Sequence, residues 1–78
     1  MPVVTVQVTR EGTVPGADRT TAEQKAKIYK GIADLLHDVL GKHPDDTWII
    51  FQEHEVEDWA RSALPLGEYR KSKRPPGA

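Results

Sequence analysis

Pro2 is the residue whose type and position point most directly to chemistry. If Met1 is removed, the nitrogen of Pro2 becomes a free secondary amine. An α-amino group has a pKa of about 7.7–8.0, and desolvation or a nearby cation lowers it towards the value suited to proton transfer at neutral pH. Pro2 is therefore predicted to be a general base. The structural alternative is a proline that only begins a strand, where its missing N–H costs nothing.

Proton abstraction beside a carbonyl produces an enolate, so a base alone does not make a site. The site also needs a donor for the oxyanion and a group that holds the carboxylate of the substrate. The planar fork of an arginine binds a carboxylate through two hydrogen bonds. Pro2 and one arginine would be a minimal set.

The stretch directly after Pro2 has the period of a strand. Over residues 3–9, valines alternate with a less apolar set of side chains. Residues 10–19 contain Gly12, Pro15 and Gly16 and are predicted to form a loop, of a length that often lines sites.

A helix is predicted to begin at Thr20 or Thr21, because Glu23 or Gln24 follows three residues later in a capping box. Its apolar residues follow the three-and-four spacing of one buried face: Ile28, Tyr29, Ile32, Leu35, Leu36, Val39 and Leu40. Gly41 is expected in the left-handed conformation just past the helix end. The helix should be about 20 residues long.

Residues 47–53 are almost continuously apolar, as a buried parallel strand tends to be. Strand, helix and strand make an α/β unit of β-α-β type with parallel strands. Residues 55–67 show no sustained period, and residues 68–72 suggest a short turn or strand. We predict one domain over residues 1–70 and a basic, disordered tail over residues 71–78.

The chain has 78 residues, 37% of them hydrophobic and 29% charged, and no cysteine. So small a domain buries only about 60–65% of its unfolded surface, and without disulfides or a convincing metal site it is expected to form a homo-oligomer. Cations cluster at the C-terminal end, so the rest of the chain is acidic, which argues against a nucleic-acid surface. The absence of a signal-peptide pattern and of a long apolar run predicts a cytoplasmic protein that does not enter a membrane.

Several short patterns, taken in order, resemble the tautomerase superfamily and its short-chain group typified by 4-oxalocrotonate tautomerase. They are Met1-Pro2 before a valine strand, Thr21-Ala22-Glu23-Gln24-Lys25 at the helix start, a helix ending at Gly41-Lys42, Phe51-Gln52-Glu53, and Trp59 six residues later. The resemblance covers roughly residues 2–70. It implies a protomer whose sheet is completed by dimerisation into four strands with the helices on one face, often as a trimer of dimers. A dimer, a trimer and a hexamer all remain open.

The resemblance also implies roles for individual residues. Pro2 would move a proton between oxygen and carbon of an enol, without a metal or organic cofactor. Trp59 would wall the pocket and help to lower the pKa of the proline. The substrate-binding arginine of the family falls near Thr20, so Arg19 or Arg10 is expected to take its place.

Two positions depart from the family pattern. Trp48 stands where the family has a second arginine, early in the second strand. The usual glycine-rich hairpin is replaced by Ala60-Arg61-Ser62-Ala63, so Arg61 becomes a further candidate for substrate binding. With Trp48 in place of a cation, we expect a flatter, more aromatic pocket that prefers monocarboxylate or aryl enols such as phenylenolpyruvate to dicarboxylates.

Other interpretations stay open. Trp48 can serve subunit packing alone, and Arg61 can be an exposed loop charge. His37, His43 and His54 are poor candidates for a metal site because of their positions, and His54 is expected at the exposed end of a strand. The rival function is a non-catalytic oligomeric β-α-β module that keeps the fold and not the activity, favoured by the missing arginine and glycines.

Overall fold

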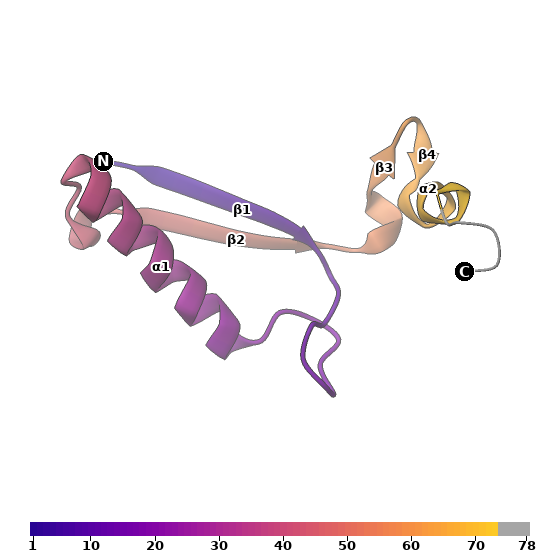
Figure 1. Ribbon diagram of the computed structural model, residues 1–78, viewed down its shortest axis with the longest axis horizontal. Helices are drawn as coiled ribbons and strands as arrows, with labels where there is room; N and C mark the ends of the chain where they lie inside the picture. Colours follow the sequence, from indigo (N-terminus) through magenta and orange to yellow (C-terminus); the bar gives the residue numbers. More distant parts are fainter. Residues whose placement is uncertain (74–78) are drawn as a thin grey trace.

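The computed structural model describes residues 1–73 and consists of a β-α-β body followed by a C-terminal arm, residues 55–73. In the body, β1 (Val3–Thr9) and β2 (Trp48–His54) are parallel neighbours joined through α1 (Ala22–Leu40) and a 3₁₀ turn, Pro44–Asp46. Figure 1 shows α1 on one side of the two strands and the arm beyond their far end. The predicted β-α-β unit is confirmed, with β2 displaced by one residue from the expected 47–53.

The register of the strands determines which side chains share a face of the sheet. Val3 pairs with Trp48 and Thr9 with His54, so the alternation of the two strands is in phase. Half-buried side chains face α1: Val4, Val6, Val8, Ile49, Phe51 and Glu53. The opposite face is exposed at Val3, Thr5, Gln7, Trp48, Ile50 and Gln52. One helix covers one face, and no described element covers the other.

Both ends of α1 are set by local sequence. Thr21 is the N-cap: its hydroxyl accepts from the backbone N–H of Gln24 at 3.1 Å, and the Gln24 side chain accepts from the N–H of Thr21 at 3.0 Å. Of the two predicted capping boxes, the structure therefore forms the Thr21–Gln24 pair. Gly41 ends the helix with a φ of 67°, the left-handed conformation that a side chain would disfavour.

The predicted apolar face of α1 is only partly covered. Ile28, Ile32 and Leu36 are half-buried, whereas Tyr29, Leu35, Val39 and Leu40 are exposed, Val39 to 70%. The prediction of one buried face was wrong for these four residues. Their positions spread over a wider arc of the helix than a two-stranded sheet can cover.

Glu53 ties the helix start to the end of β2. Its carboxylate accepts from the backbone N–H of Thr20 at 3.0 Å and lies 3.4 Å from Lys25 Nζ. The hydrogen bond from Thr20, aided by Lys25 and opposed by desolvation, lowers the pKa of Glu53 below its usual 4.5. The side chain is 10% exposed, so this contact is shielded from water better than the surface ion pairs.

The loop between β1 and α1 folds back on itself at Gly12. A Cβ at this position would lie 1.7 Å from the carbonyl oxygen of Ala17, so no other residue fits without moving the loop. Two ion pairs, Arg10–Glu55 and Glu11–Arg70, each 2.8 Å long, join the end of β1 and the loop start to the arm.

The C-terminal arm is more regular than the sequence suggested. It contains a 3₁₀ turn (Val56–Asp58), a hairpin of β3 (Ala60–Arg61) and β4 (Leu64–Pro65), and α2 (Leu66–Ser72). The prediction of an irregular segment followed by a turn or strand was wrong, because elements this short leave no period to detect. Helix α2 passes the predicted domain boundary at 70; residues 74–78 of the predicted tail lie outside the described residues.

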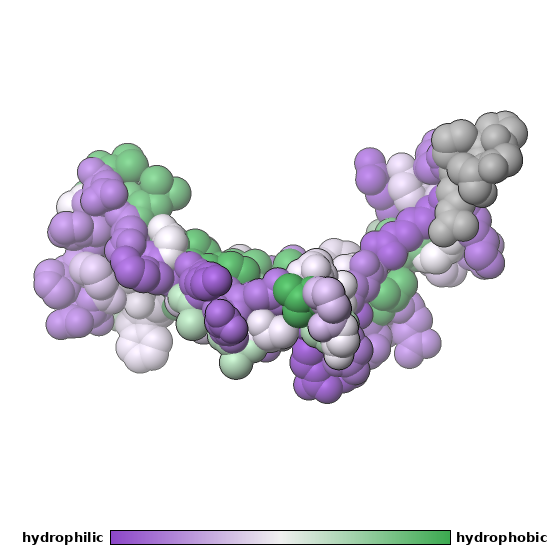
Figure 2. Space-filling model, turned by 60° about the horizontal axis from the view of Figure 1, so that its bottom comes forward, coloured by the Kyte–Doolittle hydropathy of each residue, from purple (hydrophilic) through white to green (hydrophobic). Residues whose placement is uncertain are grey.

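Residues 1–73 contain no fully buried side chain. The described chain extends over 49 × 30 × 21 Å, and Figure 2 shows apolar surface open to solvent between hydrophilic stretches. Neither helix within the described chain has the length and the apolar run that crossing a bilayer requires. A single copy therefore lacks the hydrophobic core that usually stabilises a domain.

We predict that Glu53 makes folding stability depend on pH in the acidic range. Because its pKa is lowered in the folded chain, its contribution is present above the unfolded value and is lost as pH falls through the folded value. In Glu53→Gln, the deficit in unfolding free energy relative to wild type should be largest near neutral pH and shrink below pH 4.5. Urea unfolding between pH 7 and pH 3 measures it, with Glu57→Gln as the exposed control. Profiles of Glu53→Gln and wild type that stay parallel would contradict the role of Glu53.

We also predict that the β3–β4 hairpin is strained at its turn. Ser62 and Ala63 have φ values of 54° and 65°, the left-handed region that side chains disfavour. Ala63→Gly should raise the unfolding free energy by about 0.5–1 kcal/mol, since relief of this strain outweighs the added freedom of the unfolded chain. Ala26→Gly, inside α1, is the control and should lower it by about 1 kcal/mol. A loss of stability in Ala63→Gly would refute the strain.

Candidate active site

Pro2 lies at the beginning of β1, directly beside the beginning of β2. Its carbonyl accepts a hydrogen bond of 3.0 Å from the backbone N–H of Trp48. Pro2 is half-buried, whereas Met1 is 81% exposed and the indole of Trp48 stands on the open face of the sheet at 59% exposure. Of the sequence-predicted site residues, the structure brings only Trp48 next to Pro2.

Trp59, the predicted pocket wall, lies past the other end of the sheet. Its indole Nε1 donates to the carbonyl of His54, the last residue of β2, at 3.3 Å. The rings of His54 and Trp59 meet edge to face, with centroids 5.9 Å apart and an angle of 72° between their planes. These contacts hold Trp59, which is half-buried, against the end of β2.

The candidate arginines also lie towards this far end, and each already has a partner. Arg10 contacts Glu55 at 2.8 Å and Asp18 at 3.9 Å, and the hydrogen bond to Glu55 raises the pKa of the guanidinium. Arg19 lies 3.4 Å from Asp18 on the loop. These ion pairs are exposed and weak, so a substrate carboxylate can compete for either arginine.

Arg61 contacts another residue of the arm. Its guanidinium lies 4.8 Å from the ring centroid of Tyr69, a cation–π contact between β3 and α2. In one copy it therefore stabilises the arm.

The full length of the strands separates Pro2 and Trp48 from the other candidate residues. Pro2 precedes β1, and Trp59 follows β2, which is parallel to it. The six steps along a strand of seven residues, at about 3.3 Å each, put the two strand ends about 20 Å apart. Pro2 and Trp59 of one chain thus cannot contact the same small substrate.

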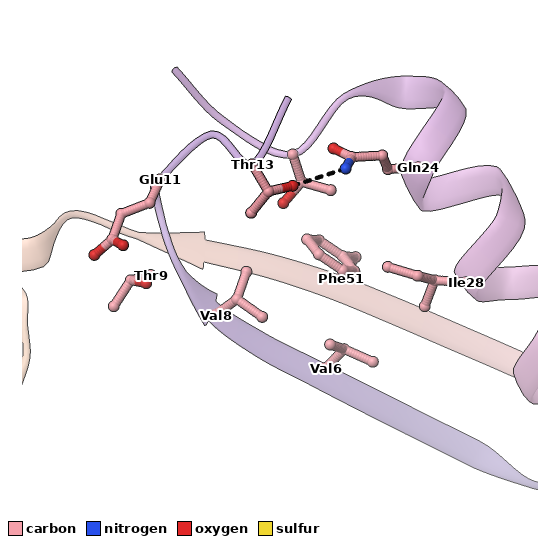
Figure 3. Close-up of a pocket in the computed structure, with 9 residues that line it drawn as sticks. Val6, Val8, Thr9, Glu11, Thr13, Gln24, Ile28 and Phe51 are labelled. Carbon is pink, nitrogen blue, oxygen red and sulfur yellow. Dashed lines mark hydrogen bonds between the residues drawn. The ribbon is translucent and has the colours of Figure 1, made fainter. Parts of the chain in front are cut away.

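One cavity in the described chain lies between α1 and the sheet and has a volume of about 300 Å³. In Figure 3, Val6, Val8, Ile28 and Phe51 form its apolar floor, and the 2.8 Å hydrogen bond from Gln24 to Thr13 crosses its rim. Neither Pro2 nor Trp59 reaches it. The cavity is the gap between the helix start and the strands, and the carboxylate of Glu11, which also lines it, is paired with Arg70 at 2.8 Å.

A smaller cleft of about 200 Å³ is built around Trp59. Its lining side chains come from both strands and from the arm: Gln7, His54, Asp58 and Trp59. His54 Nε2 lies 3.0 Å from Gln7 Oε1, so the imidazole joins the two strands on the face away from α1. His54 is half-buried here and not at an exposed strand end as predicted.

Gln7, His54 and Asp58 were not predicted from the sequence to share a cleft with Trp59. The available signal was the period of two: Gln7 and His54 lie on the same face once the register is known. Their nearness depends on that register, which the sequence alone does not give. Among residues 1–73, no three His, Asp or Glu side chains converge as a metal centre would require.

The chain is similar to known proteins in both sequence and structure. A probable tautomerase K2 from Dickeya dadantii is 35% identical over 71 residues, which span 91% of this chain and 96% of that protein. The solved structure of DmpI from Helicobacter pylori superposes with a TM-score of 0.73 at 23% identity, covering 90% of this chain and 97% of that one.

The 4-oxalocrotonate tautomerase isozymes from Methylibium petroleiphilum superpose with a TM-score of 0.70 at 21% identity, covering 91% and 98% of the two chains. At this identity the two structures support the β-α-β fold alone. Residues 2–69 match the family described as tautomerase enzyme, a range that runs from Pro2 through β1, α1, β2 and most of the arm. The chain belongs to the tautomerase family, as the order of its short patterns indicated.

Proposed function

We propose that the chain is a cofactor-independent tautomerase in which Pro2, freed by removal of Met1, is the general base and acid. It moves a proton between oxygen and carbon of a small unsaturated 2-oxo or 2-hydroxy acid. The observation that carries this proposal is the position of Pro2: it begins the family match and directly precedes β1, and its carbonyl accepts a hydrogen bond from the N–H of Trp48 at 3.0 Å.

The chemistry needs a dry site, which one copy does not provide. An amine remains a good base at neutral pH only if its charged form is disfavoured by apolar surroundings or by a nearby cation. At the end of the molecule that carries Pro2, apolar side chains are open to water: Met1, Val3, Val39, Leu40 and Trp48 are exposed by 58–81%. Figure 2 shows hydrophobic surface, in green, at the end of the molecule opposite the arm. We propose that another copy covers it.

The geometry of the sheet suggests how a second copy completes the site. In the described chain, β1 pairs with β2 along one edge and leaves its other edge for a further strand. A two-fold axis through that edge would pair two β1 strands antiparallel and complete a four-stranded sheet. Pro2 of one copy would then lie beside the end of β1 in the other copy. That end carries Arg10 and the Trp59 cleft.

In this arrangement each candidate residue has a defined task. Pro2 exchanges the proton, and Trp59 of the other copy excludes water from it. Arg10 or Arg19 exchanges its carboxylate partner for the carboxylate of the substrate and holds it through two hydrogen bonds. Trp48, beside Pro2, supplies an aromatic wall where a cation would otherwise favour a second carboxylate.

We predict that Pro2→Ala lowers kcat/KM for enol–keto conversion about 100-fold, the lower part of the range for a general base, because the primary amine that replaces proline differs in geometry and basicity. The decay of an enol absorbance measures it, and intact mass must show that Met1 is absent from the active protein. Pro15→Ala, in the exposed loop, is the matched control. A mature chain that keeps Met1, or full turnover by Pro2→Ala, would favour a non-catalytic module.

A second prediction tests whether two copies share each site. Pro2→Ala and Trp59→Ala, each poorly active alone, should recover activity when unfolded and refolded together. In a mixed two-fold pair one site carries both substitutions and the other carries neither, so random mixing restores about a quarter of wild-type activity. The two variants refolded separately and then combined are the control. A site within one chain would give no recovery.

A further inference from the structure

The cleft at Trp59 contains a charge that the proposed proton transfer does not use. Of its four lining residues, Gln7 and His54 are joined to each other by their 3.0 Å contact, and Trp59 donates to a backbone carbonyl. Within the described part of the chain, no ion pair or side-chain hydrogen bond engages the carboxylate of Asp58. The cleft therefore presents an aromatic ring, an imidazole edge and one free negative charge.

The cations near this cleft are held elsewhere. Arg10 is paired with Glu55 and Asp18, Arg61 lies on Tyr69, and neither lines the cleft. Asp58 is the last residue of its short 3₁₀ turn, next to Trp59. Its side chain is exposed to any molecule that enters the cleft. A carboxylate entering this cleft would meet a like charge with no lining cation to offset it.

We propose that Asp58 determines the substrate class by rejecting a second carboxylate and accepting a neutral group that carries a hydrogen-bond donor. This inference rests on the proposed function, which brings Pro2 of one copy beside the Trp59 cleft of another, and it adds that the cleft receives the non-reacting end of the substrate. The flat surface of Trp59, held edge to face by His54 at 5.9 Å, suits an aryl ring there. Asp58 would accept a hydrogen bond from a hydroxyl on that ring, and charge-assisted bonds of this kind are the strong ones.

The preferred substrate is thus an aryl enol acid with one carboxylate, and the hydroxyaryl form is preferred to the bare ring. The carboxylate is held by an arginine and the enol faces Pro2, so Asp58 touches only the far end. A substitution at Asp58 should therefore change KM for each substrate and leave kcat nearly unchanged, because the reacting atoms are not in contact with it.

The test compares kcat/KM for three substrates: phenylenolpyruvate, its para-hydroxy derivative, and a 2-hydroxydienoate with a carboxylate at each end. Wild type should prefer the two aryl substrates. Asp58→Asn should raise the ratio of dicarboxylate to phenylenolpyruvate turnover about five- to tenfold, the size expected for removing a partly screened charge. It should also reduce the advantage of the para-hydroxy derivative. Asp58→Lys should shift the dicarboxylate ratio further in the same direction.

Glu57→Gln is the matched control, since Glu57 belongs to the same 3₁₀ turn and does not line the cleft. It should leave all three ratios unchanged. Turnover by wild type with ratios that Asp58→Asn does not alter would overturn the role of Asp58 and leave the proposed function intact. No enol–keto turnover of any of the three substrates would overturn the proposed function, and this inference with it.

Discussion

The constraint behind the whole structure is that one helix on two parallel strands cannot enclose a core. Hydrophobic burial is the main favourable term in folding, yet no side chain among residues 1–73 is fully buried. The helix covers one face of the sheet, and Val3, Trp48 and Ile50 stand open on the other. Association with further copies would supply the missing burial, so stability and assembly are expected to be the same event.

The same constraint shapes the candidate active site. Parallel strands begin at one edge of a sheet and end at the opposite edge, so Pro2 and Trp59 are separated by the full length of β2. The end of the molecule with Pro2 has exposed apolar side chains, whereas the far end carries Arg10, Asp58 and a tryptophan fixed by His54. The candidate base lies at one end, and the candidate arginine and tryptophan lie at the other. A two-fold axis between copies would bring the two ends together.

Local chemistry explains what could be predicted from sequence. The capping pair Thr21–Gln24 and the left-handed Gly41 fix α1 through contacts within a few residues, and alternating valines fix β1. The arm was not predicted, because its 3₁₀ turn and its strands have only two or three residues and its helix has seven, which is too few to show a sustained period. Its turn even places Ser62 and Ala63, which are not glycines, at positive φ. The burial of α1 was overestimated. The spacing of apolar residues shows which side of a helix is apolar, but it does not show how much of that side the rest of the chain can bury.

The sequence by itself determined the β-α-β order, the ends of the helix and the candidacy of Pro2, since each depends on neighbours along the chain. Only the tertiary structure decided which residues distant in sequence meet: the His54–Gln7 contact, the Glu53–Thr20 hydrogen bond and the ion pair between Arg10 and Glu55. These contacts depend on strand register and on loop path, which join residues 33 to 47 positions apart. No local propensity specifies such distances, because they result from packing the whole chain at once.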